Sequence, residues 1–216
     1  PEFVNLSSSS VVDPHVRSLA HAALTKGAAE VTKTIGMLKN YLPIRASVLA
    51  APLVGPEGAE LWRQADWAPT LEFPGSGITQ IPREAIEGAS RNLVTRALVR
   101  KACGPTTPGW FVLGLAGLME DEPASPTTQE ALRDRRPTTD SLRAIPLAPG
   151  EANTAQEDEA LRFAFFLFQR GGWNAFEHML RSMGQGRSSE EAVLRAFGQS
   201  LDDLNREWIM ESPSAP

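Results

Sequence analysis

Two helical segments in the middle of the chain constrain its fold more than any other feature. Residues 84–103 place apolar side chains at three- and four-residue steps, which predicts an amphipathic helix. Gly104-Pro105 ends this helix, and residues 108–119 predict a second one. The interval between them is short, so we expect two consecutive helices with little else between them.

Composition limits the classes of protein to which the chain can belong. It has 216 residues, 42% hydrophobic and 22% charged, which is ordinary for a soluble globular protein of one large domain or two small lobes. The net charge of −5 argues against a general nucleic-acid binder. The longest apolar run, residues 163–168, is far too short to cross a bilayer. We therefore expect no nucleic-acid partner and no direct membrane insertion.

The inventory of metal-binding side chains is small. The single cysteine, Cys103, excludes an intramolecular disulfide, which fits a cytosolic protein without excluding the periplasm. The three histidines, His15, His21 and His178, stand in no convincing ligand spacing. We expect no bound metal and no cofactor.

The N-terminal part predicts one long helix. Residues 1–10 have the composition of a tag and linker. Asp13 is suited to cap a helix that begins at Pro14. Apolar side chains then recur at helical spacing over residues 14–39, and Gly27 within this stretch marks close packing.

Short strands are expected after this helix. Residues 44–50 predict one strand, and residues 70–73 and 77–81 predict two more, joined across Pro74-Gly75-Ser76. Residues 120–157 are rich in Pro, Thr and charged side chains, which predicts an irregular connection.

The C-terminal part predicts a helical lobe. The expected helices cover residues 157–170, 173–183, 188–197 and 201–210, with Gly171-Gly172 breaking the first from the second. Ser188 with Glu191, and Ser200 with Asp203, have the spacing of capping boxes at the last two.

Two groups of residues resemble the peptidase-MA-like gluzincins, a family of zinc peptidases. One is Trp110, Gly114, Leu115 and Ala116, which fit the family pattern P-x-W-L-x-E-G-L-A. The other is the C-terminal series of turn, cap and core positions: Gly186, Ser188, Glu190, Glu191, Ala192, Gly198, Ser200, Leu204 and Trp208. The resemblance spans roughly residues 11–208. It implies an α+β, predominantly helical, thermolysin-like domain with a small N-terminal sheet and a C-terminal helical lobe.

The same resemblance implies a division of the chain. Residues 11–120 would form an N-terminal α/β lobe that includes the helix pair, residues 121–156 a loop-rich connection, and residues 157–211 the helical lobe.

The zinc ligands of active family members are replaced in this chain. Those members hold zinc with an H-E-x-x-H helix and a glutamate from a following helix. The resemblance places Arg91, Asn92 and Thr95 where His, Glu and His would stand, and Leu113 where the glutamate would stand. Arginine does not ligate zinc and leucine has no donor atom. The chain is therefore expected to have no catalytic residues and no metal ligands, as in a pseudoprotease.

A degenerate cleft is the expected binding site. In active members the strand before the motif helix lies beside the substrate, and a strand edge accepts an extended peptide without a metal. The candidate binding residues are Arg91, Asn92, Thr95, Trp110, Leu113, Gly77, Ile78 and Thr79. The expected function is a protein-interaction or scaffold module, binding a protein or peptide partner, within a larger bacterial protein at its cytoplasmic or periplasmic face.

Structural explanations of these residues remain open. Arg91, Asn92 and Thr95 could be ordinary polar residues of a structural helix, with Arg91 paired to a carboxylate such as Glu87. Leu113 would then fill the former metal space. Trp110, Trp173 and Trp208 are expected as core anchors. A hydrolase with a changed, non-zinc mechanism and a structural oligomerisation domain remain the alternative functions.

Overall fold

The chain forms two compact units in the computed structural model, residues 1–101 and residues 102–216. The structure describes residues 3–8, 12–49, 63–65, 70–74, 82–104, 106–120, 142–145 and 154–211. The fold is α+β and predominantly helical, as predicted, with one small sheet in the first unit. The division differs from the expected one, because residues 102–120 belong to the second compact unit.

The first helix begins where its cap predicts. The side chain of Asp13 accepts a hydrogen bond of 2.7 Å from the backbone N–H of His15, and α1 runs over Pro14–Thr34. Its buried side includes Val16, Ala20 and Leu24. The helix is shorter than expected, because Ile35 leaves the helical conformation and residues Gly36–Tyr41 form a separate 3₁₀ helix, η1.

The sheet has four strands: β1 (Val4–Ser8), β2 (Ile44–Leu49), β3 (Arg63–Ala65) and β4 (Thr70–Pro74). Their order is β1-β2-β4-β3. β1 and β4 both run parallel to β2, and β3 runs antiparallel to β4. The strands expected at residues 44–50 and 70–73 are thus confirmed. The linker expected at residues 1–10 is wrong for residues 4–8, which form β1.

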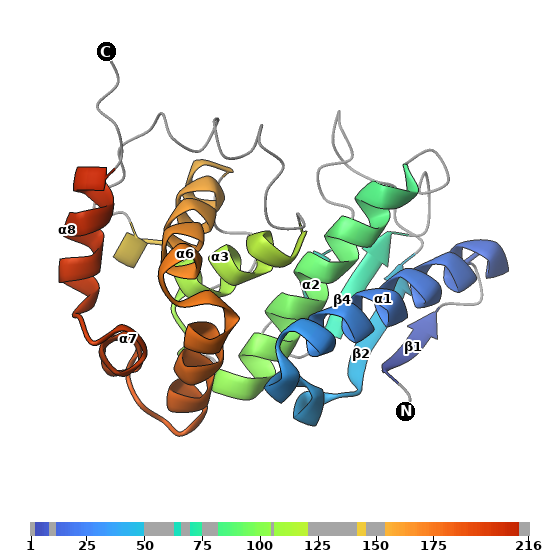
Figure 1. Ribbon diagram of the computed structural model, residues 1–216. Helices are drawn as coiled ribbons and strands as arrows, with labels where there is room; N and C mark the ends of the chain where they lie inside the picture. Colours follow the sequence, from blue (N-terminus) through green and yellow to red (C-terminus); the bar gives the residue numbers. More distant parts are fainter. Residues whose placement is uncertain are drawn as a thin grey trace, which may run out of the picture. The chain divides into compact units, whose positions relative to one another are not determined.

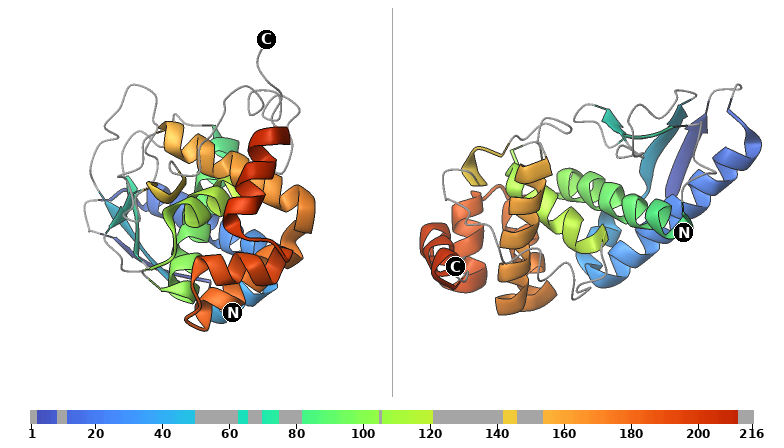
Figure 2. Two further views of the ribbon diagram at one scale, coloured as in Figure 1. Left: turned by 90° about the vertical axis from the view of Figure 1, so that its left-hand side faces the viewer. Right: turned by 90° about the horizontal axis from the view of Figure 1, so that it is seen from above.

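One face of the sheet is apolar and the other is polar. Ile44, Ala46 and Val48 of β2 are buried, on the face covered by α1 and by α2, which runs over Arg83–Cys103 (Figures 1 and 2). Arg45 of β2 points to the other face and is exposed. This period of two is the pattern of a sheet buried on one side.

A glycine allows α1 and α2 to approach each other closely. A Cβ added to Gly27 would lie 3.2 Å from the backbone N of Arg91 and 3.2 Å from the carbonyl carbon of Ser90. Such distances are tighter than nine in ten real Cβ contacts. The close packing predicted at Gly27 is confirmed, and its partner is the segment of α2 that carries Arg91.

The second unit is built around a helix that is apolar on all sides. In α3 (Gly109–Glu120) ten residues are buried, among them Trp110 and Leu113, as expected for a helix that has no polar face. It packs on α6 (Thr154–Gly184), which lies between α3 and the last two helices in Figures 1 and 2. The ring of Phe163 joins the two sides, at 5.3 Å from Trp110 and 5.0 Å from Trp208.

Local signals place the ends of the C-terminal helices. Gly172 (φ 57°, ψ −164°) interrupts α6 in a conformation almost restricted to glycine, which confirms the predicted break. Ser188 caps α7 (Ser189–Phe197), and its hydroxyl accepts a hydrogen bond of 3.1 Å from the N–H of Glu191. Ser200 caps α8 (Leu201–Glu211) in the same way through Asp203.

Several expectations fall on residues that lie outside the described ones. They concern the strand at residues 77–81 and most of the connection at residues 120–157. Among the helices that are described, none is long and apolar enough to cross a membrane.

Substituting Gly114 tests the packing of α3 on α6. In Gly114→Ala the new methyl group would lie 2.7 Å from Cβ of Ala164 and would collide with the carbonyl oxygen of Ala160. We expect a loss of about 1–3 kcal/mol in the free energy of unfolding, since overpacking outweighs the gain in helix propensity. Urea denaturation measures it. Gly117→Ala is the control, because its nearest neighbour is the end of the flexible Leu161 side chain; an equal loss in both variants would contradict the expectation.

Candidate functional site

Arg91 is the candidate whose environment is clearest. It lies in α2 beside Gly27 of α1, and its Nη1 lies 3.2 Å from Oε2 of Glu30. Only 17% of its side chain is exposed. Glu87, on the same helix, was the carboxylate that the sequence suggested for Arg91, whereas Glu30 lies on the other helix and pairs with it.

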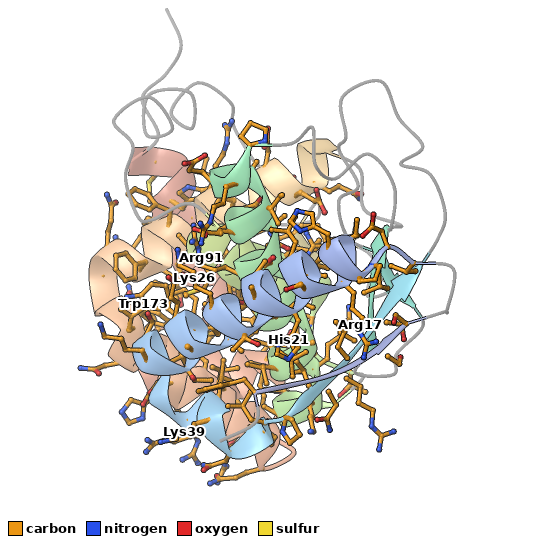
Figure 3. The ribbon with its side chains drawn as sticks, turned by 90° about the vertical axis from the view of Figure 1, so that its right-hand side faces the viewer. Arg17, His21, Lys26, Lys39, Arg91 and Trp173 are labelled. Carbon is orange, nitrogen blue, oxygen red and sulfur yellow. The ribbon has the colours of Figure 1, made fainter. Side chains whose placement is uncertain are left out.

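Glu30 and Arg91 belong to a network of charges between α1 and α2. Lys26 lies 3.9 Å from Glu30 and 2.5 Å from Glu87, and Nε of Arg83 lies 2.9 Å from Glu87. Figure 3 shows Lys26 and Arg91 next to each other on the two helices. The hydrogen bond from Lys26, supported by the one from Arg83, holds the pKa of Glu87 below its ordinary value of 4.5. We call these five residues the interhelical charge network.

Asn92 and Thr95 lie inside the protein. Thr95 is fully buried, and its hydroxyl donates a hydrogen bond of 2.8 Å to the carbonyl oxygen of Arg91, one turn earlier. Such a bond satisfies a buried threonine within its own helix. Asn92 is also buried. Both side chains therefore have the environments of interior residues.

Trp110 and Leu113 lie one turn apart in α3 and are both buried. Trp110 contacts the rings of Phe111 and Phe163 at 5.7 and 5.3 Å, which confirms it as a core anchor. Trp208 is confirmed as well. Trp173 is only partly buried, so it is a weaker anchor than expected; its ring lies 4.8 Å from that of Phe168.

The structure brings the candidates together in two separate groups. Arg91, Asn92 and Thr95 share one turn of α2 in the first unit, and Trp110 and Leu113 share one turn of α3 in the second. Gly77, Ile78 and Thr79 lie outside the described residues.

The residues that the resemblance places at zinc-ligand positions do not fit zinc. Arg91 is bonded to Glu30 and the Thr95 hydroxyl to a backbone carbonyl, while Leu113 offers only carbon. Across the described ranges, no three His, Cys, Asp or Glu side chains are gathered closely enough to hold a metal ion.

Cys103 is a poor nucleophile in this fold. It is the last residue of α2, and its Sγ lies 3.5 Å from the carbonyl oxygen of Leu180. Burial raises the pKa of its thiol to about 12, well above the ordinary value of 9.0. Since the thiolate is the reactive form, this cysteine offers little nucleophilic chemistry at neutral pH.

Comparison with known proteins does not identify the chain: no family model, no curated protein and no solved structure matches it.

Sequence reasoning missed the interhelical charge network, although part of its signal was present. Lys26 and Glu30, and Arg83 and Glu87, stand four residues apart, which is the spacing of paired charges on one helix face. That spacing indicates which faces are charged. It does not indicate that the two faces meet, because this depends on the tertiary contact at Gly27.

Removing the carboxylate of Glu87 tests the network through its pH dependence. A carboxyl whose pKa is lowered by folding stabilises the protein above its unfolded pKa, and this stabilisation is lost as the pH falls through the folded pKa. Glu87→Gln should therefore be less stable than the parent at pH 7, by about 1 kcal/mol or less. The difference should shrink as the pH falls below 4.5. Thermal or urea unfolding between pH 7 and 3 measures it.

Glu84→Gln is the matched control for this experiment. Glu84 is exposed in the first turn of the same helix and has no ion pair among the described residues. Its substitution should leave the pH dependence of stability close to that of the parent, and identical profiles for the two variants would remove the network as a source of that dependence.

The thiol of Cys103 should react slowly in the native state. With its pKa raised from 9.0 to about 12, the thiolate fraction at pH 8 falls roughly 1,000-fold. Labelling with a chromogenic disulfide reagent at pH 8 should be slow until the protein is unfolded in urea, when it should become rapid. A native rate equal to the unfolded one would show that burial does not protect this thiol.

Proposed function

We propose that this chain is a catalytically inactive peptidase-like domain, with a thermolysin-like arrangement, that serves as a protein-interaction or scaffold module of a larger bacterial protein. It would act as a pseudoprotease, at the cytoplasmic or periplasmic face of that protein. The resemblance of the C-terminal cap and core positions supports a peptidase-like fold. The residues at the would-be ligand positions support a loss of catalytic activity.

One observation carries the proposal: the residues at the positions of the family's zinc ligands have structural roles. Arg91 joins α2 to α1 through Glu30. The Thr95 hydroxyl bonds to the carbonyl oxygen of Arg91, and Leu113 contributes apolar volume to the interior. Side chains bound in this way are unavailable for a metal or a substrate. This supports a domain that keeps the scaffold and has lost the chemistry.

The cap and core positions support a resemblance in fold and do not support a particular activity. Ser188 and Ser200 serve as helix caps, Gly198 ends α7 in the left-handed conformation, and Trp208 is buried against Phe163. Positions of this kind specify a fold and leave its use open. A fold retained without catalytic groups is most useful as a binding surface.

The two alternatives call for different observations. A hydrolase of changed mechanism would need a reactive nucleophile, and the described residue closest to that description, Cys103, has a raised pKa. An oligomerisation domain would need an apolar surface. Leu194 and Met210 are the large apolar side chains with high exposure among the described residues, and isolated ones of this kind are ordinary.

Zinc titration of the metal-free domain tests the proposal. Calorimetry after dialysis against a chelator should show no stoichiometric zinc binding tighter than about 1 μM, since the donor set is incomplete. Incubation with fluorescent casein and zinc should release no peptides. Tight one-to-one binding, or turnover abolished by substituting Arg91 or Thr95, would overturn the proposal.

A variant with engineered ligands shows that the titration can detect binding. Ser18→His together with Ala22→His places two histidines one turn apart on the exposed side of α1. This variant should bind zinc measurably while the parent does not.

A further inference from the structure

The edge of the sheet at β1 offers unused backbone hydrogen-bonding groups. The backbone N–H of Ile44 donates to the carbonyl oxygen of Phe3 at 3.1 Å, and Val4 is the register partner of Ile44. In a parallel ladder this alternation directs the N–H and C=O groups of residues 3, 5 and 7 toward β2 and those of residues 4, 6 and 8 away from it. The backbone groups of Leu6 and Ser8 thus point away from β2, in the plane of the sheet. They have no backbone partner within the described ranges.

Within its own five residues, β1 carries none of the features that usually protect an edge strand. Natural sheets protect their edges with charged side chains, prolines, bulges or very short strands. β1 reads Val-Asn-Leu-Ser-Ser, with no charge and no proline, and pairs with β2 in continuous register over five residues. The opposite edge, β3, is only three residues long. Of the two edges, β1 is the one suited to accept another strand.

Two arginines and a histidine are exposed on the elements next to β1. Arg17 and His21 lie one turn apart on exposed positions of α1, and Figure 3, which views this side of the molecule, shows them on the flank of α1 next to β1. Arg45 is exposed on the neighbouring strand β2. None of the three has an ion-pair partner in the part of the chain that the structure describes. Lys26, on the same helix, does have one.

We infer that the β1 edge binds an extended acidic segment of a partner protein, which adds to the sheet beside β1. Backbone groups of Leu6 and Ser8 would pair with the segment, and Arg17 would attract its carboxylates. This inference rests on the proposed function as an interaction module and names its surface and the chemistry of its partner. An acidic peptide suits this edge better than a nucleic acid. Strand pairing uses alternating backbone donors and acceptors, which a peptide has and a nucleic-acid backbone lacks.

A synthetic peptide tests the inference. The probe is fluorescein-labelled Glu-Val-Glu-Val-Glu-Val-Glu, whose binding is followed by fluorescence anisotropy, and the comparison peptide carries lysine in place of each glutamate. The parent domain should bind the glutamate peptide and not the lysine peptide, and its affinity should fall as salt rises. Equal binding of both peptides would overturn the charge argument.

Substitutions at the edge separate strand pairing from charge attraction. Leu6→Pro removes an outward N–H and leaves the ladder with β2 intact, so it should weaken binding about tenfold or more. Leu6→Ala keeps that N–H and should weaken binding less than about threefold. Arg17→Glu should also weaken binding about tenfold, while Lys33→Glu, sixteen residues farther along α1, makes the same charge change and should have little effect. Circular dichroism checks that each variant folds. If Leu6→Pro does not fold, the comparison of Arg17→Glu with Lys33→Glu decides the outcome.

Three results would overturn the inference. They are no binding of the glutamate peptide, binding that neither Leu6→Pro nor Arg17→Glu weakens, and tighter Arg17-dependent binding of a single-stranded oligonucleotide. Each of these results would reject the β1 binding site without rejecting the proposed function, which is tested separately. Zinc binding or casein hydrolysis would remove the inactive-peptidase reading and leave the β1 result standing, whereas loss of the β1 site would leave an inactive domain with its surface elsewhere.

Discussion

The close approach of α1 to α2 at Gly27 is the contact on which the first unit depends. A missing Cβ lets the backbone of Ser90 and Arg91 come within contact distance of α1. The two helices then form one layer over the apolar face of the sheet (Figure 2). The same approach brings Glu30 within reach of Arg91, and Lys26 within reach of Glu87. A steric feature of one residue thus decides which charges meet, and the charge network follows from the packing.

Helix positions could be predicted because their signals are local. Asp13, Ser188 and Ser200 act on backbone groups two or three residues away, and Gly172 breaks α6 through its own dihedral angles. β1 could not be predicted in this way. Its five residues resemble a polar linker, and only pairing with β2, about forty residues later, makes them a strand. The partner of Arg91 was missed for the same reason, since Glu30 is sixty-one residues away in sequence.

The polar residues of α2 show why a motif position is a weak guide to chemistry. Arg91, Asn92 and Thr95 were singled out because the resemblance to the gluzincins places them where zinc ligands and a general base would stand. Two of them are buried, Arg91 pairs with Glu30, and the hydroxyl of Thr95 bonds to the helix backbone. Polar groups are common in helix interiors where such partners exist. Burial and bonding partners, which a sequence does not contain, separate a structural role from a catalytic one, and here they favour the structural role.

The parallel pairing of β1 with β2 also has a consequence for the order of folding. Its contacts close a loop that includes all of α1 and η1, and long loops are entropically costly to close. Local helices form on a much shorter timescale than such distant pairing. We therefore expect β1, although synthesised before β2, to join the sheet after α1 has formed. Until then we expect its uncharged residues to be available to other chains, which makes β1 a segment at which misassembly can begin during synthesis.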